Sequence, residues 1–413
     1  MVDKPLIIPR ERYLRLLESY RDSEQVKVLQ GVRRCGKSTI LTLYKDNLLA
    51  QGAKPQNVYY RRFDLLEEPL DVSAEALLQD VVQAWEKADR NDPFHVLLDE
   101  IQDVAGWEKV VRRLHSENGI DVCLTGSNAH ILSSDLATLL AGRSVTIDVF
   151  PLSFEEFVSF SRQLDDADAS NDELFSLFLR YGGMPSLFSL KQRSEEFVTR
   201  ELSSIFDTVL LNDVALRLGI RDIALLERLV AYLFSTSGSL FSTRKVVGAL
   251  VSSGRKTSAE TVDNYISALE KSFILHGVEQ SGIAGKQVLS PLRKFYPVDT
   301  GLRNLVTRFS PRDLGFQLED AVFVELLRRG YDVRIGTADQ AEVDFVASKH
   351  DARMYFQVTE TMLGDSVYER ELAPLRMIPD SFPKAVLTLD RFRTGTTEDG
   401  IRIVNLVDWL LGR

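Results

Sequence analysis

Cysteine is scarce in this sequence, and the residues that build small metal sites are thinly spread. Only Cys35 and Cys123 occur among 413 residues, and the five histidines lie far apart. These counts argue against a disulfide framework or a structural zinc site. Hydrophobic residues make up 44% and charged residues 27% of the chain, which is the balance of a packed globular protein. At this length, we expect two to four domains.

Long apolar runs are also missing. No stretch approaches the roughly 20 apolar residues that a helix needs to cross a bilayer. Residues 1–10 lack the basic and apolar regions of an export signal. We therefore expect a cytoplasmic protein with no membrane partner. The formal charge of −10 argues against coating of nucleic acid by bulk attraction but leaves room for a local basic face.

Residues 25–151 alternate short β-rich runs with helical stretches, which is typical of a parallel sheet covered by helices on both faces. We predict helices over 73–88 and 107–116. The predicted strands are 26–30, 58–63, 95–99, 120–124 and 145–150. The fold class is therefore α/β, and its parallel-sheet core forms a nucleotide-binding domain over residues 1–160.

A glycine-rich octapeptide stands between the first predicted strand and a helix beginning near Lys37. It matches the pattern G-x-x-x-x-G-K-[ST], in which loop N–H groups and the helix N-terminus face phosphates together. Lys37 would reach the β- and γ-phosphates of ATP, and the Ser38 hydroxyl would ligate Mg²⁺. An ordinary glycine-rich turn is the alternative. The predicted nucleotide-binding residues are Gly31, Val32, Arg33, Arg34, Cys35, Gly36, Lys37, Ser38 and Thr39.

Two carboxylates end the strand predicted over 95–99. The carboxyl edge of a parallel sheet is where such folds meet their ligands. Asp99 would hold Mg²⁺ through water, and Glu100 would orient and deprotonate the attacking water. Acidic pairs after a strand are also common helix caps, which is the competing interpretation.

Two further residues are catalytic candidates. Asn128 follows the strand predicted over 120–124, at the same sheet edge, and could hydrogen-bond the γ-phosphate or the water; it could equally cap a helix. Arg143 follows a short helical stretch at 134–142. From there, an arginine can project across a subunit boundary to stabilise transition-state charge, but an arginine at a helix C-terminus is also favourable with the helix dipole alone.

These motifs resemble those of the prokaryotic AAA-type ATPases that carry a C-terminal domain of unknown function. Nearly the whole chain takes part in the resemblance. It implies an AAA-like module, a winged-helix middle and a C-terminal domain similar to restriction-type nucleases. The segments that carry it are 31–38, Asp99-Glu100-Ile101-Gln102, 124–128, Leu140-Ala141-Gly142-Arg143, 151–157, Tyr181-Gly182-Gly183-Met184-Pro185 and 294–303.

The middle of the chain is mainly helical. We interpret residues 163–173, rich in aspartate, as an exposed linker or insertion, and residues 161–220 as a helical linker or lid. Helices over 225–234, 242–251 and 258–271, followed by a possible wing at 277–288, are typical of a winged-helix domain over 221–290. Residues 221–300 hold ten Lys/Arg and seven Asp/Glu, against the acidic balance of the whole chain.

This basic stretch predicts DNA contact, although such bundles also serve as protein-contact modules. The candidate phosphate contacts are Arg244, Lys245, Arg255, Lys256, Lys286, Arg293 and Lys294.

The C-terminal segment, residues 291–413, follows a nuclease-like pattern with two gaps. Glu319 lies on a predicted helix, and Glu342 and Asp344 share one face of a predicted strand. A restriction-type site also needs an acid and a lysine on the next strand, where Gln357 and Thr359 stand instead. We expect this fold without cutting chemistry.

The sequence as a whole predicts an oligomeric ATPase that uses ATP and Mg²⁺ and couples turnover to DNA binding or remodelling. DNA would meet the winged-helix and C-terminal domains, and a hexamer is one form that the homo-oligomer could take. Two alternatives stay open. One is a nucleotide-controlled scaffold or defence-type switch whose partner is a protein, and the other is an ATP-driven nuclease.

Overall fold

The computed structural model describes residues 7–65, 69, 71–127, 142–165, 168–216, 219–281, 292–338 and 341–413. The chain divides into two compact units, residues 1–149 with 271–273, and residues 150–270 with 274–413. The first unit corresponds to the predicted nucleotide-binding domain. The predicted helical and C-terminal domains fall together in the second unit.

The first unit is built on a five-stranded parallel sheet with the order β2-β3-β4-β1-β5. The α/β prediction is therefore confirmed, and each predicted strand is present to within two residues at either end. The strands are β1 (Val26–Gln30), β2 (Val58–Arg62), β3 (Phe94–Asp99), β4 (Ile120–Gly126) and β5 (Ser144–Asp148). The helices are α1 (Glu11–Ser19), α2 (Lys37–Ala50), α3 (Ala74–Lys87) and α4 (Trp107–His115).

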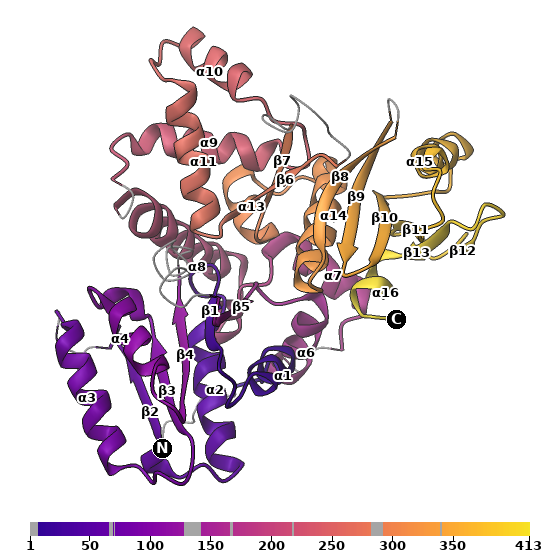
Figure 1. Ribbon diagram of the computed structural model, residues 1–413. Coiled ribbons are helices and arrows are strands. Elements are labelled where there is room, and N and C mark those ends of the chain that lie inside the picture. The colour runs from indigo at the N-terminus through magenta and orange to yellow at the C-terminus, as the bar shows by residue number, and fades with distance from the viewer. Residues whose placement is uncertain are drawn as a thin grey trace. The chain divides into compact units, whose positions relative to one another are not determined.

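Apolar and polar side chains alternate along these strands, so the two faces of the sheet differ in polarity. On one face, valines and leucines of β1, β3 and β4 pack against α3 and α4 in one apolar core. The other face carries α2 (Figure 1). There the strands present polar side chains, with Lys27, His95 and Asp121 at the amino end and Asp99 and Thr125 at the carboxyl end. Most of the buried polar side chains of these strands therefore lie on the α2 face.

The second unit begins with helices and ends in a mixed six-stranded sheet with the order β12-β13-β11-β10-β9-β8. Its helices α14 and α15 lie on opposite faces of that sheet (Figure 1). The helices are α6 (Phe154–Asp165), α7 (Asn171–Tyr181), α8 (Glu195–Thr208), α9 (Ile223–Ser235), α10 (Thr243–Ser252), α11 (Ala259–Lys271), α13 (Thr300–Thr307), α14 (Leu314–Arg328), α15 (Asp365–Met377) and α16 (Leu406–Leu410). The strands are β6 (Leu275–Glu279), β7 (Arg293–Pro297), β8 (Asp332–Ala338), β9 (Ala341–Lys349), β10 (Ala352–Thr359), β11 (Lys384–Thr388), β12 (Gly395–Thr396) and β13 (Arg402–Asn405).

The linker or insertion predicted over residues 163–173 is partly helical, since helices enter it from both ends. Helix α6 continues to Asp165, and α7 already begins at Asn171. Ser170 and Glu173 form a capping box, in which each side chain bonds the other's backbone N–H. Glu173 therefore helps to start helix α7, and its side chain stays exposed to solvent.

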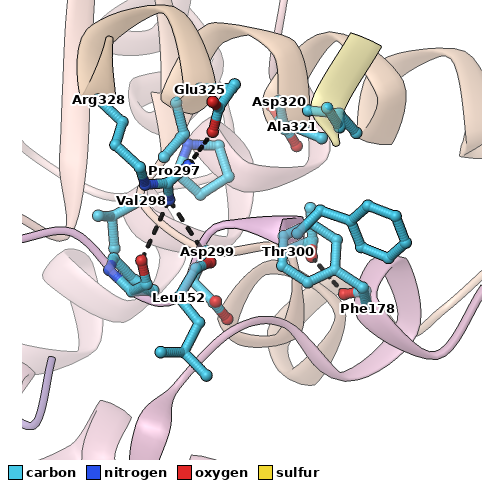
Figure 2. A pocket seen from close by; sticks show the side chains of 14 residues that line it. Leu152, Phe178, Pro297, Val298, Asp299, Thr300, Asp320, Ala321, Glu325 and Arg328 are labelled. Atoms are coloured by element: carbon cyan, nitrogen blue, oxygen red, sulfur yellow. Dashed lines mark hydrogen bonds and ion pairs between the residues drawn. The ribbon is translucent and has the colours of Figure 1, made fainter. Parts of the chain in front are cut away.

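A buried carboxylate joins two distant segments of the second unit. Asp299 accepts hydrogen bonds from the N–H groups of Gly183 at 2.7 Å and Leu302 at 3.0 Å. Burial raises the pKa of this carboxyl to about 6, and these N–H groups oppose the rise. Nearby, the Thr300 hydroxyl donates to the Phe178 carbonyl at 3.1 Å (Figure 2). Residues 178–183 and 299–302 are therefore held as one polar joint.

Phe178, Asp299 and Thr300 line a small cavity together with Arg328 (Figure 2). Arg328 holds a third segment of the chain against this cavity. Its guanidinium donates to the carbonyl of Pro151 at 3.1 Å and pairs with Glu325. Residues 151–157 and 181–185, which the sequence marks as motifs, thus surround a structural joint in the second unit.

Replacing Gly182 should test how tightly this joint is packed. Gly182 has φ +76°, and a Cβ there would stand 2.0 Å from Asp299 Oδ1. We expect Gly182→Ala to lower the free energy of unfolding by about 2–4 kcal/mol, measured by denaturant titration. Gly254→Ala is the matched control, because its φ is +86° with no atom within 4 Å, and it should cost only about 1–2 kcal/mol. Equal losses in both variants would refute the tight packing at Asp299.

Candidate nucleotide-binding site

The glycine-rich loop runs from the end of β1 to the start of α2, as predicted, and its glycines are sterically required. Gly31 has φ +151°, and a Cβ there would lie 2.1 Å from the Val149 carbonyl oxygen. Gly36 has φ +101° and is the N-cap of α2. The loop therefore presents the N-terminus of a 14-residue helix, where the helix dipole favours an anion.

Lys37 lies inside this loop rather than on the surface. Its side chain is buried, and the ammonium donates to the carbonyls of Gly31 at 2.9 Å and Val32 at 3.2 Å. A buried ammonium at the positive end of a helix is costly without an anion. The position thus suits the role predicted for Lys37 toward nucleotide phosphates.

Arg10, which no sequence motif indicates, stabilises the glycine-rich loop through a hydrogen bond. It precedes α1 and is buried, and its guanidinium donates to the Cys35 carbonyl at 2.9 Å. The same guanidinium lies 4.6 Å from the centre of the Tyr13 ring. Its separation from Cys35 by 25 positions leaves no local pattern by which to find it.

Asp99 and Ser38, the two predicted metal ligands, are brought together. Asp99 is fully buried at the end of β3, and its Oδ1 accepts from the Thr125 hydroxyl at 2.5 Å. Burial raises the pKa of the Asp99 carboxyl, and hydrogen bonds from Thr125 and Ser38 oppose the rise. Among the described residues, Asp99 Oδ2 has no hydrogen-bond partner. A hydroxyl beside a carboxylate with a spare oxygen fits the oxygen-rich ligand set of Mg²⁺.

Glu100 occupies a strained backbone position at the sheet edge. Its φ is +55°, in the left-handed region that a residue with a side chain seldom adopts. Its N–H donates to the Thr125 hydroxyl at 3.0 Å, and its carboxylate accepts from the Gln102 amide. Thr125 therefore orients both acidic residues at once. Strain of this kind often marks a functional site.

Of the two remaining catalytic candidates, the structure describes only Arg143, and Arg143 does not lie at this edge. Asn128 lies outside the described residues. Arg143 is exposed just before β5, where its carbonyl accepts from the Val26 N–H at 3.0 Å, so it lies at the amino end of the sheet. The five residues of β1 separate that end from Gly31 by roughly 15 Å at the usual rise of a strand.

Some of the candidate DNA contacts are exposed, and others form salt bridges within the protein. Arg244, Lys245 and Lys256 are exposed, whereas Lys286 lies outside the described residues. Arg255 pairs with Asp222, and Arg293 pairs with Glu270. Helices α9, α10 and α11 occur as predicted. Of the wing predicted at 277–288, residues 277–281 are described and include the end of β6, but its antiparallel partner β7 lies beyond the predicted wing. The last candidate, Lys294, is buried.

Lys294 is therefore wrong as a phosphate contact. Its ammonium pairs with Glu342. Burial lowers the pKa of Lys294, but the nearby charges of Glu319, Glu342 and Asp344 outweigh it and the net shift is upward. It is an internal counter-charge of the C-terminal acidic residues.

The nuclease-like residues gather around this lysine. Burial raises the pKa of Asp344 to about 7, and Asp344 Oδ2 accepts from the Val358 N–H at 2.8 Å. The Gln357 amide oxygen lies 3.4 Å from the Asp344 nitrogen. Thr359 instead donates to the Thr361 carbonyl at 3.3 Å. The arrangement of the acids matches the prediction, with Gln357 beside them.

A separate group of possible ligands lies at the amino end of the first sheet. Ligand atoms of Asp22, His95 and Asp121 lie within 4.8 Å of one another. Their spread along the chain hid them from a search for ligand spacing. The Lys27 ammonium pairs with Asp121, so a cation already balances this group.

Comparisons with known proteins agree with this geometry. A family model described as "AAA domain" matches residues 23–158, and one described as "Domain of unknown function" matches residues 172–313. A protein of Haemophilus influenzae, described as uncharacterized, is 36% identical over 405 residues, which cover 98% of this chain and 99% of that protein. A protein of Methanocaldococcus jannaschii, also described as uncharacterized, is 26% identical over 98% of this chain and 90% of its own length.

Among solved structures, a Walker-type ATPase of Pyrococcus abyssi has the same fold, with a TM-score of 0.51 at 16% identity over 73% of this chain and 96% of that one. None of the helices in the described part of the chain is long and apolar enough to cross a membrane. The matched range 23–158 includes the glycine-rich loop and the paired acids Asp99 and Glu100. The chain belongs to the AAA-type P-loop ATPase family, in which an AAA domain precedes a domain of unknown function.

Proposed function

We propose that this protein is a Mg²⁺-dependent ATPase that acts as a homo-oligomer and couples ATP hydrolysis to DNA binding or remodelling. The observation that carries the proposal is the position of the Lys37 ammonium inside the loop at the start of α2. Family membership supports nucleotide binding in general. The cytoplasmic location stays a prediction from the sequence.

Each residue of the site has a separate task in this proposal. The loop from Gly31 to Thr39 binds the phosphates through its N–H groups, and Lys37 binds the β- and γ-phosphates. Ser38 and Asp99 hold Mg²⁺, which neutralises phosphate charge when bound. Glu100 orients a water molecule and accepts its proton.

The burial of Asp99 supports this division of tasks. Burial raises the pKa of its carboxyl because the charged form loses hydration, and a bound divalent cation would favour that charged form. Thr125 keeps both Asp99 and Glu100 aimed at the sheet edge. Asn128 follows this strand end, and we propose that it contacts the γ-phosphate or the water.

Oligomerisation is proposed from the position of Arg143. Its guanidinium is exposed at the sheet edge opposite the glycine-rich loop, so it is better placed for the nucleotide of a neighbouring subunit than for its own. An arginine supplied in this way stabilises the charge of the transition state.

DNA binding is proposed for the helices α9 to α11 with the β6–β7 pair, which we interpret as a winged helix, and for the C-terminal domain. Exposed Arg244, Lys245 and Lys256 support it. We further propose that the C-terminal domain does not cut DNA. Gln357 supplies no charged metal ligand, and Lys294 is already paired with Glu342. Each such loss typically costs a few kcal/mol of transition-state stabilisation.

Variants of Lys37 and Glu100 should separate binding from hydrolysis. We expect Lys37→Ala to abolish nucleotide binding, because it removes the phosphate cation. Glu100→Gln should bind ATP as the wild type does and hydrolyse it at least about 100-fold more slowly. Equilibrium binding and turnover measured on the same preparations check both. Hydrolysis by Glu100→Gln at near the wild-type rate would exclude a catalytic role for that residue.

Mixing two inactive variants should test whether Arg143 acts between subunits. Arg143→Ala lacks the arginine, and Lys37→Ala lacks the nucleotide, but a mixed oligomer contains sites with both groups. We expect the mixture to recover part of the ATPase activity that neither variant has alone. Activity of the wild type in a preparation that sedimentation shows to be monomeric would rule out the trans arrangement.

Charge reversal should test the proposed DNA surface. We expect the triple variant Arg244→Glu, Lys245→Glu, Lys256→Glu to bind duplex and forked DNA at least about tenfold more weakly, with a shallower salt dependence. It should also lose any stimulation of ATP turnover by DNA, while basal turnover stays unchanged.

The control for this variant makes the same change in net charge at exposed arginines outside the two domains proposed to bind DNA, Arg15→Glu, Arg90→Glu, Arg200→Glu. If both triple variants lost the same amount of DNA affinity, the loss would come from the net charge alone and not from a specific DNA surface. Wild-type turnover that ignores DNA would favour the protein-directed switch instead. The DNA should remain uncut in Mg²⁺ and in Mn²⁺.

A further inference from the structure

Arg62 is a cation at the nucleotide edge of the sheet that the proposed function has not used. It is the last residue of β2 and stands directly opposite Asp99 in the parallel pairing of β2 with β3. Two residues earlier on the same strand, the Tyr60 hydroxyl lies 3.1 Å from the Thr42 hydroxyl in α2. Because strand side chains alternate, Arg62 shares the α2 face with Ser38 and Asp99.

The neighbouring arginine points the other way. Arg61 pairs with Asp80 of α3 at 2.7 Å, on the face of the sheet covered by α3 and α4. Two adjacent arginines on one strand therefore meet different surroundings, and only Arg62 faces the metal ligands.

The guanidinium of Arg62 lies between two carboxylates. Its Nε and Nη2 donate to Asp64 at 2.9 Å and 2.8 Å. The same Nε is 3.3 Å from Asp99 Oδ2, the buried oxygen without a hydrogen-bond partner. Arg62 thus balances part of the charge at the position proposed for Mg²⁺.

Asp64 lies within electrostatic reach of the glycine-rich loop. The pKa of its carboxyl is lowered, first by the hydrogen bonds from Arg62 and also by the positive charge of Arg33 in the loop. The pair of Arg62 and Asp64 therefore stands near the loop. Both side chains are partly exposed, at 32% and 42%, so a ligand can reach them.

We propose that Arg62 binds the terminal phosphate of a bound nucleoside triphosphate, exchanging Asp64 for phosphate oxygens. The inference rests on the proposed nucleotide site and deepens it. A planar guanidinium offers two parallel N–H donors, which fit a phosphate as well as they fit the Asp64 carboxylate. Asp64 holds the fork in place until the phosphate replaces it.

The γ-phosphate is the favoured partner for a geometric reason. Asp99 and Ser38 would hold the Mg²⁺ that neutralises charge on the β- and γ-phosphates. Arg62 adjoins Asp99 on the edge strand β2, and β3 and β4 lie between that strand and β1. Asp99 therefore lies between Arg62 and the glycine-rich loop that follows β1. This places Arg62 at the γ-phosphate end of the proposed site. A cation there distinguishes ATP from ADP.

The experiment compares binding of a non-hydrolysable ATP analogue with binding of ADP, both by calorimetry, so that catalysis plays no part. Arg62→Ala should weaken binding of the analogue by about 10- to 100-fold, as expected for charge-assisted hydrogen bonds. Its ADP affinity should change by less than about twofold. Arg62→Lys should give an intermediate loss, because it keeps the charge without the fork. Arg61→Ala is the matched control and should bind both nucleotides as the wild type does.

Two further arms exclude indirect roles. Asp64→Asn releases Arg62 from its partner, so the affinity for the ATP analogue should stay equal or rise. If Asp64→Asn lost as much affinity as Arg62→Ala, the pair of Arg62 and Asp64 would be a structural salt bridge and not a phosphate contact. Repeating the titrations with a chelator in place of Mg²⁺ should preserve the selective loss. A loss seen only with Mg²⁺ would assign Arg62 to holding Asp99 and refute the phosphate contact.

The outcomes also separate this inference from the proposed function. A wild type that bound neither nucleotide would refute both. If the wild type binds both nucleotides, and Arg62→Ala matches it or loses affinity for both equally, the contact with the terminal phosphate is wrong while the nucleotide site stands.

Discussion

The parallel register of β1, β3 and β4 is the constraint on which the site depends. It places the end of β1, Asp99 and Thr125 at one edge of the sheet, although they are far apart in the sequence. At the opposite edge, Lys27 pairs with Asp121, whose carboxylate lies 3.3 Å from His95 Nδ1. Burial lowers the pKa of Lys27 to about 8. A one-residue slip would turn these polar groups into the apolar core under α3 and α4 and leave them unpaired.

Much of the first unit could be predicted because its signals are local. Runs of β-branched residues bounded by polar residues indicate strands, and the glycine-rich octapeptide fixes its own place between strand and helix. Asp99 and Glu100 were found because they directly follow such a run. Arg10 and Arg62 were not, because the site residues that they contact, Cys35 and Asp99, lie 25 and 37 positions away, and neither arginine stands in a motif.

The errors have equally specific causes. The acids near residue 170 were interpreted by composition, while the Ser170-to-Glu173 spacing of a capping box was present in the sequence and signals a helix start. Lys294 was counted as surface charge, although the alternation of β7 puts it on the same side as buried Tyr296. Charge alone does not reveal which lysine faces inward, since that depends on acids such as Glu342 that come from a distant strand.

The joint at Asp299 bears on how the second unit can be dissected. The carboxylate on one side of the joint and the Gly183 N–H on the other are 116 positions apart, and the predicted domain limit at residues 290 and 291 falls between them. A protein cut there would separate Asp299 from its donor and leave a buried acid uncompensated. Limited proteolysis in that interval should therefore yield two pieces that stay associated, and a C-terminal fragment expressed alone should depend on the helical fragment for its solubility.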